Sequence, residues 1–455
     1  MTFSSFSANS LKIIKKEDLQ NKFKSINWNP SGKISDIIGT MIEAVLPNSR
    51  IAMLAEIQSS LHNQEILAEV VGFRGAKALL LPYGDLSGIS PGAKVTSQKM
   101  YDQIPVGDFL LGHVINPFMK EISNKKLRIP SDCMTMPLEK PALNPLEREK
   151  IAYPLVLGLR ALDGLLTMGE GQRIGIFAGS GVGKSVLLGR IAKDSSAEIN
   201  VIGLIGERGR EVRQFLEGEL GDEGLAKSVV VVVTSDQSPL MKIRGAKVVT
   251  TIAEYFASQG KKVLLMMDSL TRVAQAQREI GLAVGEPPTS KGYPPSVYSL
   301  LPRLLERCGP QLAGHGSVSG IYTVLVDGDD FNDPMPDAIR AILDGHVNLS
   351  RDLAAKGHFP AIDILNSVSR VMHQVASPEH IKIAQRVKSL LSEYQKNVDF
   401  IQLGSYLPGS NPLLDQAISL RLKMEEFLRQ DLGDCSSLEE TLGRLIHIFV
   451  NEGRA

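Results

Sequence analysis

Five short apolar segments between residues 155 and 376 constrain the fold more than any other feature of this sequence. They read RIGIFA, INVIGLI, SVVVVVT, KVLLMMD and IYTVLV, and each is apolar over almost its whole length. Strands with this pattern are buried on both faces, as in parallel sheets covered by helices. Stretches with helical periodicity lie between them, such as residues 239–259. We therefore expect an α/β domain with a parallel sheet.

A glycine-rich loop follows the first of these segments. Residues 178–185 read Ala-Gly-Ser-Gly-Val-Gly-Lys-Ser, between an apolar strand and a helix that opens at Lys184. Glycines let backbone N–H groups turn towards phosphate oxygens, Lys184 suits the β- and γ-phosphates, and the Ser185 hydroxyl suits Mg²⁺. Ala178 replaces the usual first glycine, but alanine is small enough for a turn that does not need a positive φ. The predicted nucleotide-binding residues of the loop are Ala178, Gly179, Ser180, Gly181, Val182, Gly183, Lys184, Ser185 and Val186.

Acidic residues stand at the ends of two other apolar segments. Asp268 ends the strand 262–267, where nucleotide-binding sheets place a metal-side aspartate, although such a residue can also be a plain helix cap. Glu207 follows the strand 199–205, at the edge where α/β sheets bind ligands, and could orient and deprotonate the attacking water. Glu211 is the second candidate, and a solvated charge cluster is the alternative for both. Together with the loop, these residues predict Mg²⁺-dependent ATP hydrolysis.

The rest of the chain divides by pattern. Residues 1–28 are polar and lysine-rich, and predict either a segment that binds a partner or an anionic lipid surface, or a solvated chain end. Residues 29–100 contain the short runs GTMIEAVL, RIAMLAEI, EILAEVVGF and AKALLLPY, which predict a small β-barrel or sandwich. The α/β domain is placed at residues 101–376 with an extended linker at 120–154, and residues 377–455 have helical periodicity.

Composition bounds the partners and the compartment. Fifty basic and fifty acidic residues cancel, which argues against a mainly electrostatic nucleic-acid binder. The three cysteines form no metal-binding pattern and fit a reducing cytoplasm. No stretch approaches the roughly 20 apolar residues of a membrane span, so we expect at most peripheral contact with a membrane.

Several long runs resemble the rotary-type hexameric ATPases related to the F1 catalytic subunit, and within that group the flagellar and type III secretion export ATPases. The resemblance rests on AGSGVGKSVLLG (178–189), GERGREVRQFLEGEL (206–220), DSLTRVAQAQREIGLAVGEPP (268–288), KGYPPSVYSLLPRLLERCG (291–309) and HFPAIDILNSVSRVM (358–372). The GERGREVR and KGYPPSV motifs distinguish this group from the energy-coupling synthase subunits. The resemblance implies an N-terminal β-barrel, a RecA-like P-loop core and a C-terminal helical domain.

The resemblance also implies roles by position around the phosphates. Glu207 corresponds to the catalytic glutamate, and Arg208 to the interface arginine beside it. Asp268 would hold the Mg²⁺ shell with Ser185, and Arg272 would line the phosphate site.

For two further residues, Arg370 and Phe359, the resemblance and the residue type suggest different roles. Arg370 corresponds to an arginine that a neighbouring subunit inserts at the γ-phosphate, where a guanidinium stabilises the developing charge. By residue type alone it could be a surface ion-pair former. Phe359 stands where the family places an aromatic ring against adenine, and could otherwise be a core side chain.

The expected function is ATP hydrolysis by a homohexameric ring that energises protein export through a flagellar apparatus. The implied partners are a regulatory stator-like protein, a central stalk-like protein, export substrates and their chaperones, at the inner face of the cytoplasmic membrane. A virulence injectisome ATPase is one alternative, and a non-catalytic ring subunit, which would lack Glu207, is another. A Rho-like RNA translocase would need a basic, aromatic RNA site, whereas residues 30–100 offer only Phe73 and Tyr83 as aromatics.

Overall fold

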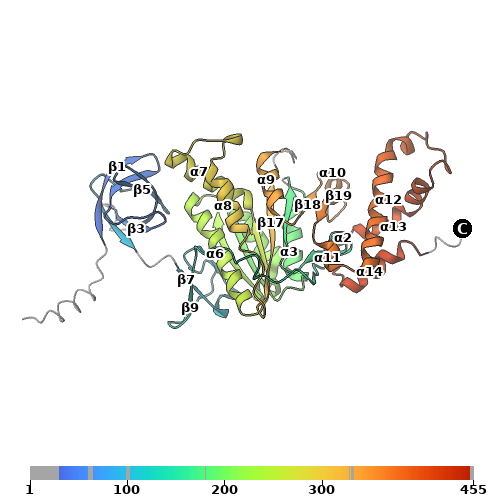
Figure 1. Ribbon diagram of the computed structural model, residues 1–455, viewed down its shortest axis with the longest axis horizontal. Helices are drawn as coiled ribbons and strands as arrows, with labels where there is room; N and C mark the ends of the chain where they lie inside the picture. Colours follow the sequence, from blue (N-terminus) through green and yellow to red (C-terminus); the bar gives the residue numbers. More distant parts are fainter. Residues whose placement is uncertain are drawn as a thin grey trace, which may run out of the picture. The chain divides into compact units, whose positions relative to one another are not determined.

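The computed structural model describes residues 30–59, 65–98, 103–179, 181–326, 328 and 333–450. The described chain divides into two compact units, of which the first holds strands β1 to β6 and the second holds the elements from β7 onward (Figure 1). The predicted N-terminal segment 1–28 and Ser180 of the glycine-rich loop lie outside the described residues.

The first unit is a small barrel built from six strands of the described chain. Around the barrel they follow in the order β1 (Ser31–Ile38), β2 (Met41–Val45), β5 (Lys77–Pro82), β4 (Glu65–Arg74), β3 (Leu54–Gln58) and β6 (Lys94–Gln98). Inward-facing side chains such as Ile42, Ile57 and Leu80 form a core of its own. The structure confirms a barrel, and adds β1 and β6 to the four apolar runs, because these two strands carry mostly polar side chains.

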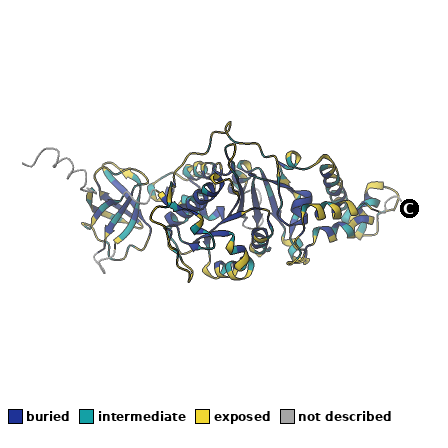
Figure 2. Ribbon diagram, turned by 90° about the horizontal axis from the view of Figure 1, so that it is seen from below, coloured by how far each residue is buried: buried dark blue, intermediate teal, exposed yellow. Residues whose placement is uncertain are grey.

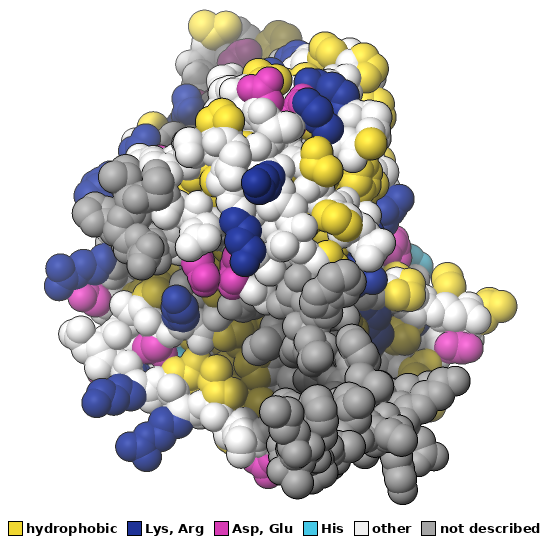
Figure 3. All heavy atoms as spheres, turned by 90° about the vertical axis from the view of Figure 1, so that its left-hand side faces the viewer, with side chains coloured by type: hydrophobic (Ala, Val, Ile, Leu, Met, Phe, Trp, Pro, Cys, Tyr) yellow, Lys and Arg dark blue, Asp and Glu magenta, His cyan; other side chains and the backbone are white. Residues whose placement is uncertain are grey.

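The barrel carries charges of both signs, and Arg74 and Lys77 form ion pairs with Glu43. Figure 3 shows Lys and Arg side chains interspersed with Asp and Glu over the described part of the face that it views. Phe73 is 43% exposed and is the one exposed aromatic side chain in the described part of the barrel. This surface lacks, within the described residues, the aromatic platform on which single-stranded RNA stacks.

A sheet of nine described strands forms the centre of the second unit. Its strands follow in the order β19 (Ile362–Ser369), β18 (Gly345–Leu349), β12 (Arg173–Ala178), β17 (Ser317–Leu325), β15 (Lys262–Asp268), β13 (Ile199–Glu207), β14 (Ser228–Thr234) and β8 (Val114–Ile115), with β16 (Gly309–Pro310) beside β17. The five apolar segments are β12, β17, β15, β13 and β14, and they pair in parallel. Figure 2 shows these strands as buried. The predicted parallel sheet is confirmed.

Helices account for this burial. The long α6 (Pro239–Ser258) packs on β13, β14 and β15, and α7 (Leu270–Val284) packs on α6 and on α8 (Pro295–Leu305). Helix α3 (Lys184–Asp194) packs on a π-helical turn, Phe215–Leu220. The other helices described here are α2 (Arg160–Leu165), α4 (Gly209–Gln214), α5 (Gly221–Ala226), α9 (Pro334–Ile342), α10 (Arg351–Ala355) and α11 (Met372–Val375), with 3-10 turns at Asp108–Leu110 and Ser290–Gly292.

The segment expected as an extended linker lies along the second unit. It contains β9 (Met134–Pro137), which pairs with β7 (Gln103–Val106), and it ends at β10 (Pro154–Leu155), which pairs antiparallel with β11 (Met168–Gly169), the strand that follows α2. Arg148 donates a hydrogen bond to the carbonyl oxygen of Cys308 at 2.8 Å. These contacts hold the segment against the sheet domain.

The described C-terminal region is helical, as predicted. It comprises α12 (Pro378–Gln402), α13 (Pro412–Leu428) and α14 (Leu438–His447), and α14 opens with a capping box between Ser437 and Glu440. All three helices pack on α2, which places the segment after α13 beside the start of α2. Among the described residues, no helix combines the length and apolarity required to cross a bilayer.

Candidate active site

The glycine-rich loop joins β12 to α3 at the C-terminal edge of the parallel strands. Gly181 and Gly183 have φ angles of 82° and 87°, which residues with a side chain rarely adopt. Gly183 immediately precedes α3, and no described side chain caps this helix end. The N–H groups of the first helical turn are therefore available to an anion.

A polar cavity of about 550 Å³ opens over this loop. Its wall combines Lys184 and Ser185 from α3, Glu207 from the end of β13, and Arg272 from α7. The other predicted residues that line it are Ala178, Gly179, Gly181, Gly183, Val186 and Arg208. Sequence segments far apart in the chain thus meet at one site.

An ion-pair network connects Lys184 and Glu207, which line this cavity, with Asp268, which is not among its lining residues. The Lys184 ammonium contacts the Asp268 carboxylate, and its Nζ is 3.8 Å from Oε1 of Glu207. β13 and β15 are neighbours in the sheet, and their register brings the two acidic residues to the same edge. Asp268 is only 4% exposed, and Thr323 of β17 donates a hydrogen bond to its Oδ1 at 2.7 Å. This aspartate is therefore fixed in place from the adjacent strand.

The Glu207 carboxyl has an unusual acidity. Burial raises the pKa of Glu207 to about 7, the negative charge of Asp268 acts in the same direction, and Lys184 opposes both. Glu211 also raises this pKa. A carboxyl that titrates near neutral pH can take up a proton from water during a reaction, as a general base must.

The three predicted arginines differ in their position relative to the polar cavity. Arg272 donates from Nη1 to Gln275 at 2.9 Å, while its buried Nε has no hydrogen-bond partner among the described residues. The Arg208 side chain is 73% exposed at the rim of the cavity. Arg370 follows β19, is exposed, and is not among the residues that line this cavity or the next.

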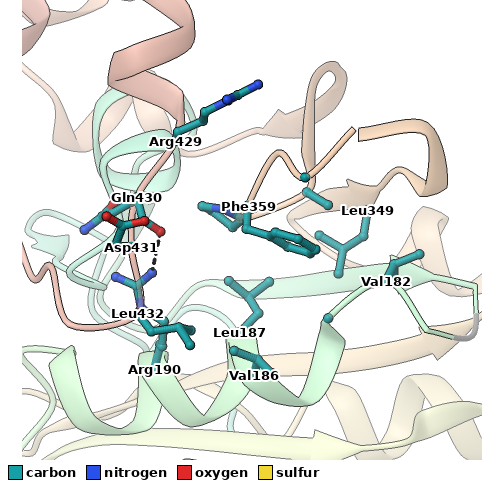
Figure 4. Close-up of a pocket in the computed structure, with 14 residues that line it drawn as sticks. Val182, Val186, Leu187, Arg190, Leu349, Phe359, Arg429, Gln430, Asp431 and Leu432 are labelled. Carbon is teal, nitrogen blue, oxygen red and sulfur yellow. Dashed lines mark hydrogen bonds between the residues drawn. The ribbon is translucent and has the colours of Figure 1, made fainter. Parts of the chain in front are cut away.

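A second, largely apolar cavity of about 440 Å³ adjoins the first. Gly183 and Val186 line both cavities, so the two meet at the first turn of α3. Figure 4 shows the Phe359 ring directed into it, towards Leu349 of β18 and Leu187 of α3. Phe359 is 47% exposed, which an ordinary core phenylalanine would not be.

Sequence reasoning missed part of this second cavity. Residues 429–432, which follow α13, form one of its walls. In sequence they read Arg-Gln-Asp-Leu, a polar run that looks like an ordinary helix end. Thr323 was missed for a similar reason, because a threonine within a buried strand carries no local signal of function.

Protein-family models match most of the chain. The model of the ATP synthase alpha/beta family β-barrel domain matches residues 34–98, and that of the family's nucleotide-binding domain matches residues 158–369. The model of the T3SS EscN ATPase C-terminal domain matches residues 376–447.

Individual proteins match over nearly their full length. A flagellum-specific ATP synthase from Pseudomonas aeruginosa is 49% identical over 420 residues, covering 92% of this chain and 93% of the relative. A type 3 secretion system ATPase from Sinorhizobium fredii is 47% identical over 412 residues, covering 90% of each. The solved structure of the assembled ATPase EscN from the type III secretion system of enteropathogenic E. coli matches with a TM-score of 0.85 at 46% identity, over 92% of this chain and 99% of that chain. A structure of EscN with its central stalk EscO matches with a TM-score of 0.84 at 46% identity, over the same shares.

Proposed function

Because this chain belongs to the family of flagellum-specific ATP synthases and type III secretion ATPases, and is an ATPase, we propose that it hydrolyses Mg-ATP as a homohexameric ring that energises flagellar protein export. The observation that carries the proposal is the pair of adjoining cavities. One is polar and contains Lys184 and Glu207, the other is apolar and contains Phe359, and they share Gly183 and Val186. A triphosphate in the first cavity would place its base in the second.

The polar cavity has the groups that phosphoryl transfer requires. The free N–H groups of α3 and the Lys184 ammonium would hold the β- and γ-phosphates. Glu207, with its raised pKa, would orient a water molecule and accept its proton during attack on the γ-phosphate. Arg272 lines the same cavity and would contact the phosphates.

The residues present fit Mg²⁺. Ser185 lines the cavity, and Asp268 offers a carboxylate fixed by Thr323. Mg²⁺ is usually bound by one or two protein oxygens together with substrate phosphates, so the larger acidic clusters of dedicated metal cages are not needed. Within the described ranges there is no cluster of three or more His, Cys, Asp or Glu residues suited to a metal. When bound, the ion would offset charge on the β- and γ-phosphates.

Arg370 would act on the active site of a neighbouring subunit. It is exposed and separate from both cavities of its own chain, which is the placement that a residue acting across an interface needs. The assembled structure of the EscN relative supports a ring of such subunits.

The export partners are the finer part of the proposal. A central stalk-like protein is supported by the complex of EscN with EscO. Phe400, Leu403 and Leu407 near the end of α12 are 59%, 78% and 74% exposed, as expected for a surface that a partner covers. A stator-like regulator and peripheral membrane contact at the inner face are assigned to residues 1–28 on sequence alone, and export substrates and chaperones complete the set.

A genetic test separates the flagellar role from its alternative. Deleting the gene should abolish secretion of flagellar subunits and motility, and the wild-type gene should restore both while Lys184→Ala should not. The similar match to a type 3 secretion system ATPase supports the injectisome alternative. That alternative would be correct if the deletion stopped effector secretion while motility persisted.

A biochemical test addresses the ring. The ATPase rate per subunit should rise with protein concentration, because active sites shared between subunits form only on assembly. A rate per subunit that stays constant down to concentrations where the protein is monomeric would exclude shared sites. RNA binding that is tight and salt-sensitive would favour a Rho-like translocase instead.

A further inference from the structure

The segment after α13 is tied into the sheet domain through one buried glutamine. Gln430 is 4% exposed and lines the apolar cavity. Its Oε1 accepts a hydrogen bond from the Arg160 backbone N–H at 2.9 Å, and its Nε2 donates to the Gly158 carbonyl at 2.9 Å. Its backbone N–H donates to the carbonyl oxygen of Phe359 at 2.9 Å. Gln430 therefore contacts the start of α2 and the residue that carries the exposed ring.

Arg160 holds this segment from the side of α2. It is 3% exposed, and its Nε donates to the Phe427 carbonyl at 3.0 Å. Its two Nη atoms contact the Arg429 carbonyl and the Asp434 carboxylate. A buried guanidinium is stable only when its donors are satisfied, so these contacts fix the path of residues 427–434.

Arg190 holds the same segment from the side of α3. It is 8% exposed and donates to the carbonyl oxygens of Gln430 at 3.2 Å and Asp434 at 2.7 Å. Figure 4 shows Arg190 below Gln430 with the hydrogen bond between them. Because α3 begins at Lys184, the helix that faces the phosphates is joined directly to a wall of the apolar cavity.

We infer that Gln430 is a positioning residue for nucleotide binding, which holds Phe359 and residues 429–432 against α3 and so sets the affinity for the base of the nucleotide. This inference rests on the proposed binding of adenine in the apolar cavity. Gln430 lines only the apolar cavity, whereas Glu207 lines only the polar one. Loss of Gln430 should therefore weaken binding of ligands that carry a base, while the rate of bond cleavage stays unchanged.

The test compares a ligand that has the base with one that lacks it. Gln430→Ala is assayed for kcat and for inhibition of ATP hydrolysis by ADP and by pyrophosphate, at a fixed protein concentration. We expect inhibition by ADP to weaken about tenfold, from the loss of a buried hydrogen-bond set. Inhibition by pyrophosphate and kcat should stay within about twofold, because the polar cavity keeps its groups. Gln402→Ala, at an exposed glutamine at the end of α12, is the matched control.

A double-mutant cycle tests whether Gln430 acts through Phe359. Phe359→Ala should weaken inhibition by ADP, and adding Gln430→Ala should cost little more, because the second change removes support for a ring that is already gone. Additive effects would overturn the inference, as would equal weakening of ADP and pyrophosphate. If Phe359→Ala leaves inhibition by ADP unchanged, the apolar cavity does not hold the base. That result would reject the proposed function of the cavity, on which the inference about Gln430 rests.

A second variant guards against a general loss of structure. Gln430→Met keeps a side chain of similar length and removes only the side-chain hydrogen bonds. Its thermal midpoint is measured beside the inhibition constants. A folded Gln430→Met protein that binds ADP as the wild type does would overturn the inference, and selective weakening of ADP would support it.

Discussion

The two adjoining cavities are built in opposite ways. The polar cavity takes its chemistry from the glycine-rich loop, from Glu207 in its wall, and from Asp268, which contacts Lys184 from the end of the neighbouring strand. The apolar cavity is assembled from α3, the Phe359 segment and residues 429–432 after α13. The segments of the first are brought together by the parallel sheet, whereas those of the second are held by contacts between helices and loops.

We expect the polar cavity to determine the catalytic rate and the apolar cavity to determine the affinity for the nucleotide. Charged groups held by neighbouring strands act where charge develops in the reaction, so changes there should alter the catalytic rate. Apolar contacts around a base are the same before and during bond cleavage, so changes there should alter affinity alone. The predictions below test this division, from the largest expected effect to the smallest.

The largest effect is expected from Arg370→Ala. Loss of a guanidinium at the γ-phosphate should lower kcat by roughly 10³-fold or more, with ATP binding retained. Arg421→Ala, at an exposed arginine of α13, is the control. Mixing Arg370→Ala with Lys184→Ala subunits should restore part of the activity, because each supplies what the other lacks across the interface. If the mixture stays inactive, the assignment of Arg370 to a neighbouring subunit is wrong.

The next largest effect is expected from Glu207→Gln. The amide keeps the size of the side chain but cannot accept a proton, so hydrolysis should fall by about 10²- to 10⁴-fold while ATP binding stays near the wild-type value. Single-turnover hydrolysis and equilibrium binding of ATP measure the two quantities separately. Glu217→Gln, at a side chain that is 65% exposed and does not line the cavity, should behave as the wild type. If Glu207→Gln hydrolyses ATP at the wild-type rate, another acid must be the general base, and Glu211 is the first candidate.

The raised pKa of Glu207 predicts that hydrolysis depends on pH, whereas binding of ADP does not. The carboxyl must be deprotonated to accept a proton, and its pKa is about 7 in the free enzyme. kcat/KM should therefore fall by about tenfold for each pH unit below that value and level off above it. Inhibition by ADP over the same range should change much less. A flat kcat/KM between pH 5.5 and 7.5 would contradict the assignment of Glu207 as the base.

The smallest effect is expected from Thr323→Val. Valine keeps the shape of threonine and removes the hydrogen bond to Asp268, so the metal-side carboxylate loses one constraint. We expect kcat to fall several-fold, with inhibition by ADP unchanged, which is the reverse of the pattern expected for Gln430→Ala. An effect on ADP without one on kcat would mean that the two cavities do not divide the work in this way.

The sequence predicts the sheet and most of the polar cavity because their signals are local. Strands apolar along their whole length could be recognised singly, and Lys184 stands in a contiguous motif. Strands β18 and β19 were not recognised, since polar residues such as His346 on β18 and Asp363 on the edge strand β19 interrupt the apolar pattern. Gln430 and Thr323 have no such signal, because their importance comes from partners far along the chain.

The hydrogen bonds of Gln430 have a consequence for how the molecule can be cut or recombined. Family models divide the chain between residues 369 and 376, yet a wall of the apolar cavity comes from beyond that boundary. A fragment truncated at the boundary would keep every residue of the glycine-rich loop but leave Arg160 and Arg190 without their acceptors after α13. A chimaera that takes its helical region from a relative would also take residues 427–434 from that relative. Part of the wall of its apolar cavity would then come from the other protein.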